Sequence, residues 1–397
     1  MPHLTFRNVN DAFVSLVTTF RNGQRGDQQE IEIVKTNTRN GPVLQIPGPM
    51  ILTFTNPTER LLFNNNRDAN CFFHLFESLY MLSGGNKIVP LVYYAAQIAN
   101  YSDDGETQNG AYGYRWRNAK TSHDLDEFDG HSFQLTKIDQ LQVLIQHLKN
   151  EPNSRRAVLQ MWNVEDDLLK IDPPNKSKDV CCNLCVMFSL RDVSIVDVFD
   201  TRTEPEHTTA TNRVLDMTVI NRSNDLVWGM LGANYVHFSF LQEYMAANLG
   251  VEVGVYNQMS NNLHIYTENN SGFKHEEWLA DKTPDWYLER FMCNPPISTC
   301  KQVPLIRYPA IFERELSIFI EASIKHEFLC NYTEPFLQSV ATPLLWAFEL
   351  HKKREYDLAL NAIKACQADD WRIAGDNWLK KRKANYEAKE LERNNAL

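Results

Sequence analysis

The sequence contains no apolar stretch of the roughly 18 residues that a membrane-spanning helix requires. Residues 1–21 alternate polar and apolar side chains and include no small-residue cleavage site, so we expect no signal peptide. These two absences predict a protein that acts in the cytoplasm and has no membrane partner. The composition is otherwise typical of a globular protein, with 43% hydrophobic and 23% charged residues among 397.

Basic residues are fewer than acidic ones, because 40 lysines and arginines stand against 50 aspartates and glutamates. The formal net charge of -10 counts against a nucleic-acid partner, since proteins that bind duplex DNA non-specifically normally have a basic face. The local pair Arg155-Arg156 still suits a single phosphate group. An alternative remains open in which this pair and Arg115-Trp116-Arg117 contact single-stranded nucleic acid.

The cysteines do not form the pattern of a disulfide framework, which belongs to short secreted chains. Eight cysteines are scattered over the chain, and a reducing cytosol is the simpler interpretation. Cys181-Cys182-x-x-Cys185 lacks the second Cys/His pair of a structural zinc site. Adjacent cysteines on a strand also point to opposite faces, so we expect no metal.

The hydrophobic periodicity predicts an α+β fold with a mixed or antiparallel sheet. Helices are expected over residues 70–83, 133–150 and 235–249, and strands over residues 180–190, 215–220 and 260–266. Residues 193–213 are rich in threonine and glutamate and have little hydrophobic period. They are interpreted as a surface insertion within a hairpin.

The character of the sequence changes near residue 275, after which helical periodicity dominates. The helical segments are residues 274–292, 312–330, 335–365 and 368–396. The chain is therefore divided into a catalytic domain over residues 1–272 and an all-helical C-terminal extension over residues 273–397.

Cys182 lies between two groups of polar residues that suit covalent chemistry on a phosphorylated pyrimidine. Ser154-Arg155-Arg156 precedes it, and Asn221 to Asp225, Asn234 and His264-Ile265-Tyr266 follow it. Guanidinium groups bind anions, an amide complements a planar amide ring, and a thiolate attacks an electron-poor carbon. Taken singly, each feature has an ordinary structural explanation, such as a cysteine that fills the core.

The order and spacing of these segments resemble the thymidylate synthase family, which includes the phage-type pyrimidine nucleotide hydroxymethylases. The resemblance covers roughly residues 30–270 and implies a mixed sheet with packed helices. Its segments are the helix around Glu77, Tyr112-Gly113 with Trp116-Arg117, Ser154-Arg155-Arg156 with Trp162-Asn163, Val180 to Asn183, Arg222 to Asp225 with Gly229, Asn234, and His264-Ile265-Tyr266. Two departures stand out: Cys181 replaces the family proline, and one extra residue lies between Gly229 and Asn234.

The resemblance implies a role for each matching residue. Cys182 is the expected nucleophile, Arg222 lies beside it and should lower its pKa, and Glu77 relays protons through water. Asn234 reads the base, and Tyr112 belongs to the same catalytic group. The residues expected to bind the phosphate are Arg39, Arg155, Arg156, Arg222 and Ser223.

The remaining implied contacts concern the sugar, the one-carbon donor and the subunit arrangement. His264 and Tyr266 are expected to bind the sugar 3′-hydroxyl, and Asp225 the pterin of 5,10-methylene-tetrahydrofolate. The family's arginine pair reaches across from the neighbouring subunit, so Arg155 and Arg156 imply a homodimer with shared active sites.

The resemblance implies one-carbon transfer to carbon 5 of a pyrimidine nucleoside monophosphate, and it leaves substrate and product open. The amide of Asn234 suits uracil, which favours deoxyuridylate over a cytosine nucleotide, whether deoxyribose or ribose. The Arg222 to Gly229 segment is closer to hydroxymethylases, and no short apolar tail like that of the synthases closes the sequence. We therefore expect hydroxymethylation of deoxyuridylate, with reductive methylation as the alternative. A catalytically silent relative is a third possibility.

Overall fold

The computed structural model describes residues 3–23, 30–64, 67–124, 133–174, 176–194, 211–268, 299–328 and 331–395. Its strands are β1 (His3–Phe6), β2 (Val34–Thr38), β3 (Gly41–Ile46), β4 (Met50–Phe54), β5 (Ala119–Asp124), β6 (Phe133–Ile138), β7 (Val158–Gln160), β8 (Asn183–Ser194), β9 (Thr211–Asn221), β10 (Asn224–Asp225), β11 (Glu252–Ser260) and β12 (Leu263–Tyr266).

The α-helices of the described residues are α1 (Val9–Asn22), α2 (Cys71–Leu82), α3 (Val89–Tyr94), α4 (Tyr112–Arg117), α5 (Gln140–Asn150), α6 (Ala233–Leu249), α9 (Pro309–Ile324), α10 (Thr342–Lys352), α11 (Tyr356–Ala362) and α12 (Asp369–Asn395). Short 3₁₀ turns occur at η1 (Ala96–Tyr101), η2 (Leu168–Lys170) and η6 (Ile363–Ala365). Wider i→i+5 turns occur at η3 (Leu226–Met230) and η5 (Leu337–Ala341).

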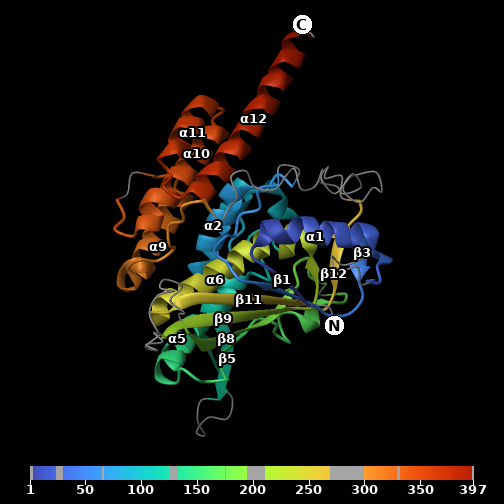
Figure 1. Cartoon of the computed structure of the whole chain (residues 1–397), viewed down its shortest axis with the longest axis vertical. Coiled ribbons are helices and arrows are strands. Elements are labelled where there is room, and N and C mark those ends of the chain that lie inside the picture. The colour runs from blue at the N-terminus through green and yellow to red at the C-terminus, as the bar shows by residue number, and fades with distance from the viewer. Residues whose placement is uncertain are drawn as a thin grey trace, which may run out of the picture.

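A six-stranded mixed sheet forms the base of the molecule, in the order β1-β4-β11-β9-β8-β7 (Figure 1). The pairs β1–β4 and β11–β9 are parallel, and the other pairs are antiparallel. A second sheet has the order β10-β12-β3-β2, and β5 pairs with β6. The α+β class and the mixed sheet expected from the sequence are thus confirmed.

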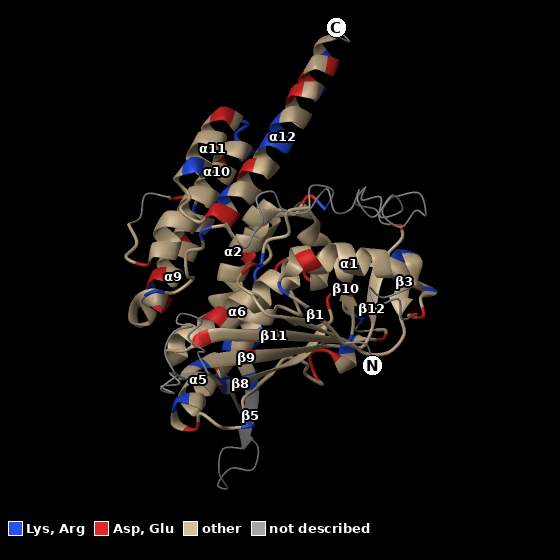
Figure 2. Ribbon diagram, viewed as in Figure 1, with Lys and Arg blue, Asp and Glu red and all other residues tan. Residues whose placement is uncertain are grey.

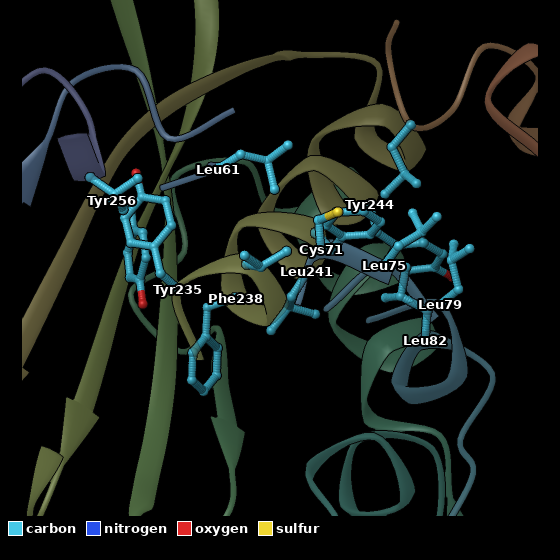
Figure 3. Close-up of a cluster of buried hydrophobic side chains, with 14 of the residues drawn as sticks. Leu61, Cys71, Leu75, Leu79, Leu82, Tyr235, Phe238, Leu241, Tyr244 and Tyr256 are labelled. Carbon is cyan, nitrogen blue, oxygen red and sulfur yellow. The ribbon is translucent and has the colours of Figure 1, made fainter. Parts of the chain in front are cut away.

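The core lies between the large sheet and two successive layers of helix. Helix α6 packs on β9 and β11, and α2 packs on α6. Alternate residues of β11 are buried, as a strand with one covered face requires. Figure 3 shows how Leu75 and Leu79 of α2 meet Leu241 and Tyr244 of α6. Eleven of the twelve residues of α2 are buried, so this helix is enclosed by protein on nearly every side.

Helices α9 to α12 gather on the opposite side of α2 from the sheet, and α12 runs outward to the C-terminus (Figure 1). Phe72 of α2 contacts the ring of Trp378 in α12, with 5.3 Å between centroids, and that of Phe348 in α10, with 5.4 Å. Beyond these contacts α12 carries alternating acidic and basic residues (Figure 2), the pattern of a solvated helix. The expected boundary at residues 272/273 lies outside the described residues.

Three sequence expectations need correction. Residues 133–138 form strand β6 and not the start of a helix, because they pair with β5 before α5 begins at Gln140. The expected helix over residues 335–365 is broken at Arg354, whose φ of 65° lies in the left-handed region. The hairpin β8–β9 continues to the pair Ser194↔Thr211, so only residues 195–210 of the predicted insertion lie outside the described strands.

No helix among the described residues is long and apolar enough to cross a membrane. The segment 274–292, expected to be helical, falls outside those residues.

The ring contacts predict that the extension is part of the same cooperative unit as α2. Trp378→Ala should lower the free energy of unfolding by about 3–5 kcal/mol, since it removes a buried indole that packs on Phe72. Leu391→Ala is the control, because this side chain is 62% exposed and its loss should cost less than about 0.5 kcal/mol. Urea unfolding monitored by fluorescence and circular dichroism measures both. An unchanged midpoint for Trp378→Ala would show that the extension does not stabilise the catalytic part.

Candidate active site

Cys182 lies immediately before β8, at an irregularity of the strand pairing. The register of β8 against β9 shifts between Asn183 and Cys185, which is the signature of a β-bulge. Cys181 is fully buried, and its sulfur lies 3.0 Å from the Asn183 carbonyl oxygen. Cys182 is partly exposed. Of the two adjacent thiols, Cys182 is therefore the accessible one.

Arg222 follows β9 and reaches across to the cysteine loop. Its backbone N–H donates to the Cys182 carbonyl over 2.9 Å, which continues the β8–β9 pairing. Its Nε donates to the Cys181 carbonyl and its Nη2 to the Val180 carbonyl, both over 2.9 Å. Nη2 also lies 3.4 Å from the Cys182 sulfur. One guanidinium thus fixes the loop and places positive charge beside the thiol.

The pKa of Cys182 is raised above its usual value, which contradicts the expectation that it is lowered. Burial disfavours the thiolate, and this effect exceeds the favourable charges of Arg222 and Arg39. Asp179 and Asp167 add smaller unfavourable effects. The nearby positive charge can be inferred from the sequence, whereas the loss of hydration depends on the fold.

A buried ion pair supports the other side of the cysteine loop, and sequence reasoning missed it. The carboxylate of Asp167 is fully buried, pairs with Arg115, and accepts the Cys181 N–H over 3.1 Å. Arg115 also donates to the carbonyls of Met161 and Asn109. Aromatic residues and arginines alternate around Arg115, and this pattern does not indicate an ion pair with Asp167. The pair anchors the loop that presents Cys182.

Two further predicted residues lie close to the thiol. Arg39, in the β2–β3 turn, donates to the carbonyls of Ser177 and Lys178, and its charge lowers the pKa of Cys182. Tyr112 begins α4, and burial together with the charge of a Cys182 thiolate raises the pKa of its hydroxyl. Gly113 allows α4 to approach α2, because a Cβ atom there would lie 2.1 Å from the Met81 carbonyl oxygen.

Arg155 and Arg156 are not brought to Cys182 within the chain. They precede β7, whose Val158 pairs with Met187 and whose Gln160 pairs with Cys185. Both arginines are thus exposed at the end of β7 that is remote from Cys182. Arg156 forms an ion pair with Glu151 across 2.7 Å.

His264 and Tyr266 stand together on β12, beside the short strand that carries Asp225. Their rings meet edge to face with centroids 5.3 Å apart, and Asp225 is the register partner of His264. Asn262 donates through Nδ2 to Gln45, so its Oδ1 faces His264 Nδ1 at 3.0 Å. Burial lowers the pKa of His264. The neutral ring donates through Nδ1, which leaves Nε2 as an acceptor.

Asn234 lies in the first turn of α6, directly after the wide turn η3. The Leu231 N–H donates to the Leu226 carbonyl, an i→i−5 bond that accommodates extra backbone before the helix. The Asn234 amide faces Gly229, where a Cβ atom would lie 3.2 Å from its Nδ2. Ser223, the remaining predicted phosphate ligand, follows Arg222 directly and is partly exposed.

Arg67 and Trp228 form a platform beside Asp225 that sequence reasoning did not find. The Asp225 carboxylate caps η3 by accepting the N–H groups of Val227 and Trp228. Arg67 is buried, donates to the Val227 carbonyl over 2.9 Å, and its guanidinium carbon lies 4.1 Å from the Trp228 ring centroid. Burial lowers the pKa of Arg67 to about 10, against the attraction of Asp225 and Asp68. In the sequence, Arg67 follows a run of three asparagines, which matches no functional motif.

Glu77 is buried in α2, as expected, and it faces α6. Its Oε2 lies 2.9 Å from His237 Nε2, although the direction is not that of a good hydrogen bond. His237 was not predicted, since a histidine inside a hydrophobic helix gives no functional signal by itself.

Residues 115–117 do not offer the free cations and the accessible ring that the nucleic-acid alternative assigned to them. Trp116 is fully buried, and Arg115 is bound to Asp167. Arg117 forms ion pairs with Asp139 and Glu313. All three side chains are engaged inside the protein.

The balance of charges around Cys182 predicts a measurable pH dependence. Arg222→Ala removes the main group that opposes the burial effect, so the pKa of Cys182 should rise further. At a fixed pH between 7 and 9 the thiolate fraction should fall. Iodoacetamide labelling followed by peptide mass spectrometry should give a rate profile displaced to higher pH. A lower or unchanged apparent pKa in the variant would contradict this electrostatic role. Cys185 serves as internal control, because it is half-buried and burial is what raises its pKa.

Comparison with known proteins identifies the family of the chain. A sequence model of the thymidylate synthase family matches residues 58–283. The chain is 36% identical over 372 residues to the deoxyuridylate hydroxymethyltransferase of Pseudomonas phage M6. This alignment covers 91% of the chain and 92% of that protein. The alignment leaves less than a tenth of the chain uncovered, so it includes helices α9 and α10.

More partial matches extend the same relationship. The deoxyuridylate hydroxymethyltransferase of Bacillus phage SP01 is 34% identical over 62% of this chain and 58% of its own length. The thymidylate synthase of Vesicomyosocius okutanii is 25% identical over 53% of this chain and 64% of its own. The chain belongs to the thymidylate synthase family.

Proposed function

We propose that this chain transfers a one-carbon unit to carbon 5 of deoxyuridylate, where water converts the unit to a hydroxymethyl group. The observation that carries the proposal is the accessible Cys182 thiol with the Arg222 guanidinium 3.4 Å away. The two phage relatives described above are named for the same activity.

Cys182 acts as the nucleophile. Its thiolate adds to carbon 6 of the pyrimidine, which makes carbon 5 electron-rich and able to accept the one-carbon unit. Burial raises the pKa of this thiol, and the charges of Arg222 and Arg39 act in the opposite direction and favour the thiolate.

The phosphate is held by Arg39, Arg222 and Ser223 of one chain and by Arg155 and Arg156 of its partner. Arg222 donates through Nε and Nη2 to loop carbonyls, and its Nη1 would bind the phosphate. The exposure of Arg155 and Arg156, far along β7 from Cys182, is what delivery to a neighbouring subunit requires. We therefore propose a homodimer with shared sites.

The base and the sugar are read from the other side of the site. The Asn234 amide both donates and accepts, which matches the N–H and oxygen edge of uracil. His264 Nε2 is left as an acceptor by the bond at Nδ1 and suits a sugar hydroxyl, with Tyr266 beside it.

The residues around Asp225 fit 5,10-methylene-tetrahydrofolate, which supplies the one-carbon unit when bound. Trp228 is 38% exposed and stacks under the buried Arg67, so it offers a flat surface for an aromatic group. Asp225 would hold the pterin, as a carboxylate accepts from N–H groups of such a ring.

The proposal is tested by weighing the nucleotide product. We expect the chain to convert deoxyuridylate, in the presence of methylene-tetrahydrofolate, to a product heavier by one CH₂O unit. A gain of one CH₂ would identify a thymidylate synthase instead. Deoxycytidylate and cytidylate, assayed in parallel, identify the preferred base and sugar. Cys182→Ser should lower turnover by at least about a thousandfold while nucleotide binding is retained.

Cys181→Ser is the matched control, because the neighbouring thiol is buried and faces the Asn183 carbonyl. It should keep most of the activity. Loss of turnover in Cys181→Ser together with full activity in Cys182→Ser would show that Cys181, and not Cys182, is the nucleophile.

The base-reading role of Asn234 gives a separate prediction. Asn234→Asp should shift the ratio of kcat/KM towards the cytosine nucleotide by about tenfold or more, because a carboxylate accepts from the exocyclic amino group. Steady-state assays with both nucleotides measure the ratio. An unchanged ratio would remove Asn234 from the base contact. Asn248→Asp, at the far end of α6, is the control for a new charge on this helix.

A further inference from the structure

Glu77 and His237 form a buried carboxylate–imidazole pair that joins α2 to α6. The atoms Oε2 and Nε2 lie 2.9 Å apart, and the side chains are 7% and 3% exposed. Such a pair gives little stability, since the loss of hydration offsets the attraction, and apolar residues of similar volume would pack as well. Its presence in an otherwise apolar helix interface therefore calls for a functional explanation.

His237 lies on the same side of α6 as the proposed base-reading residue. Asn234 and His237 are three positions apart, which places them one turn apart on one face of the helix. The next residue, Phe238, packs on Tyr112, with ring centroids 5.8 Å apart, and Tyr112 lies close to Cys182. The turn of α6 that carries His237 is thus adjacent to the reaction centre.

The hydrogen-bonding capacity of the imidazole is not used within the described residues. Neither ring nitrogen of His237 has a well-directed hydrogen-bond partner there, although both atoms are buried. Buried polar atoms are normally satisfied by protein or by an ordered water. The imidazole of His74 interacts with the charges of both Arg67 and His237, and burial lowers the pKa of His74. The site thus suits one water molecule beside Glu77.

We propose that His237 is a positioning residue that orients Glu77 and an ordered water for the addition that makes the hydroxymethyl group. This inference rests on the proposed function and names the groups that direct its outcome. The electrophile is the methylene attached to carbon 5 while Cys182 is still bonded to carbon 6. It accepts either hydride or water, and a water held at Glu77 favours hydroxymethylation.

The step balances without any further reactant. The water oxygen bonds to the methylene carbon as Glu77 takes its proton, and the electrons of the C=C bond move into the ring. They return to form the C5=C6 double bond as the carbon–sulfur bond breaks and Cys182 leaves as thiolate. His237 does not touch the nucleotide, and it acts by fixing the carboxylate and its water.

The test separates formation of the methylene intermediate from its hydration. Tritium at carbon 5 is released when the intermediate forms, whereas hydroxymethyl product appears only after water adds. His237→Leu should lower product formation by about tenfold or more relative to tritium release. An added thiol such as 2-mercaptoethanol should then trap the waiting methylene as a nucleotide thioether. His237→Gln, which keeps a side-chain nitrogen donor, should restore part of the hydration.

His351→Gln is the control, since this histidine packs against Trp378 in the extension and lies outside the site. Thermal unfolding and deoxyuridylate binding are measured for each variant. A parallel fall in tritium release and product, or an unchanged ratio in both His237 variants, overturns the inference. If the unaltered enzyme makes no hydroxymethyl nucleotide, the proposed function itself fails, and that outcome does not depend on any His237 variant.

Discussion

The site depends on the bridge between Arg222 and the cysteine loop. The carbonyl groups of the loop before β8 lie outside the β8–β9 ladder, and the guanidinium satisfies two of them. The same bonds hold Nη2 beside the Cys182 sulfur. A lysine could not do this, because it lacks the planar fork. The conformation of the loop and the positive charge beside the thiol therefore depend on the same arginine.

The bridge places positive charge beside a thiol that is hard to ionise. Burial disfavours the Cys182 thiolate and raises its pKa. Arg222 and Arg39 only partly offset the effect. In a dimer, the exposed Arg155 and Arg156 of the partner would add charge at the phosphate, so binding and activation would be coupled through the same ion.

Local patterns predicted the elements whose sequence and environment agree. The buried helix α2, the strand β12 with His264 and Tyr266, and the turn with Arg39 were all expected. Strand β6 was not, because its pairing with β5 overrides a helical period that continues into α5. Arg67, Asp167 and His237 were missed for a different reason. Each acquires its role from partners more than ten positions away in the sequence, at Val227, Arg115 and Glu77.

The extension is connected to the same site through a short chain of contacts. Arg382 of α12 lies over the Trp378 ring and pairs with Asp68 across 2.9 Å. Asp68 adopts a positive φ of 49°, a conformation that an aspartate tolerates when its side chain is bound. Its neighbour Arg67 supports Trp228. Asp68, which is bound by α12, directly follows Arg67, which stacks on Trp228. Helix α12 therefore fixes the segment that supports the proposed folate platform. The relation to the phage M6 protein includes α9 and α10, so the first part of the extension is shared with that relative.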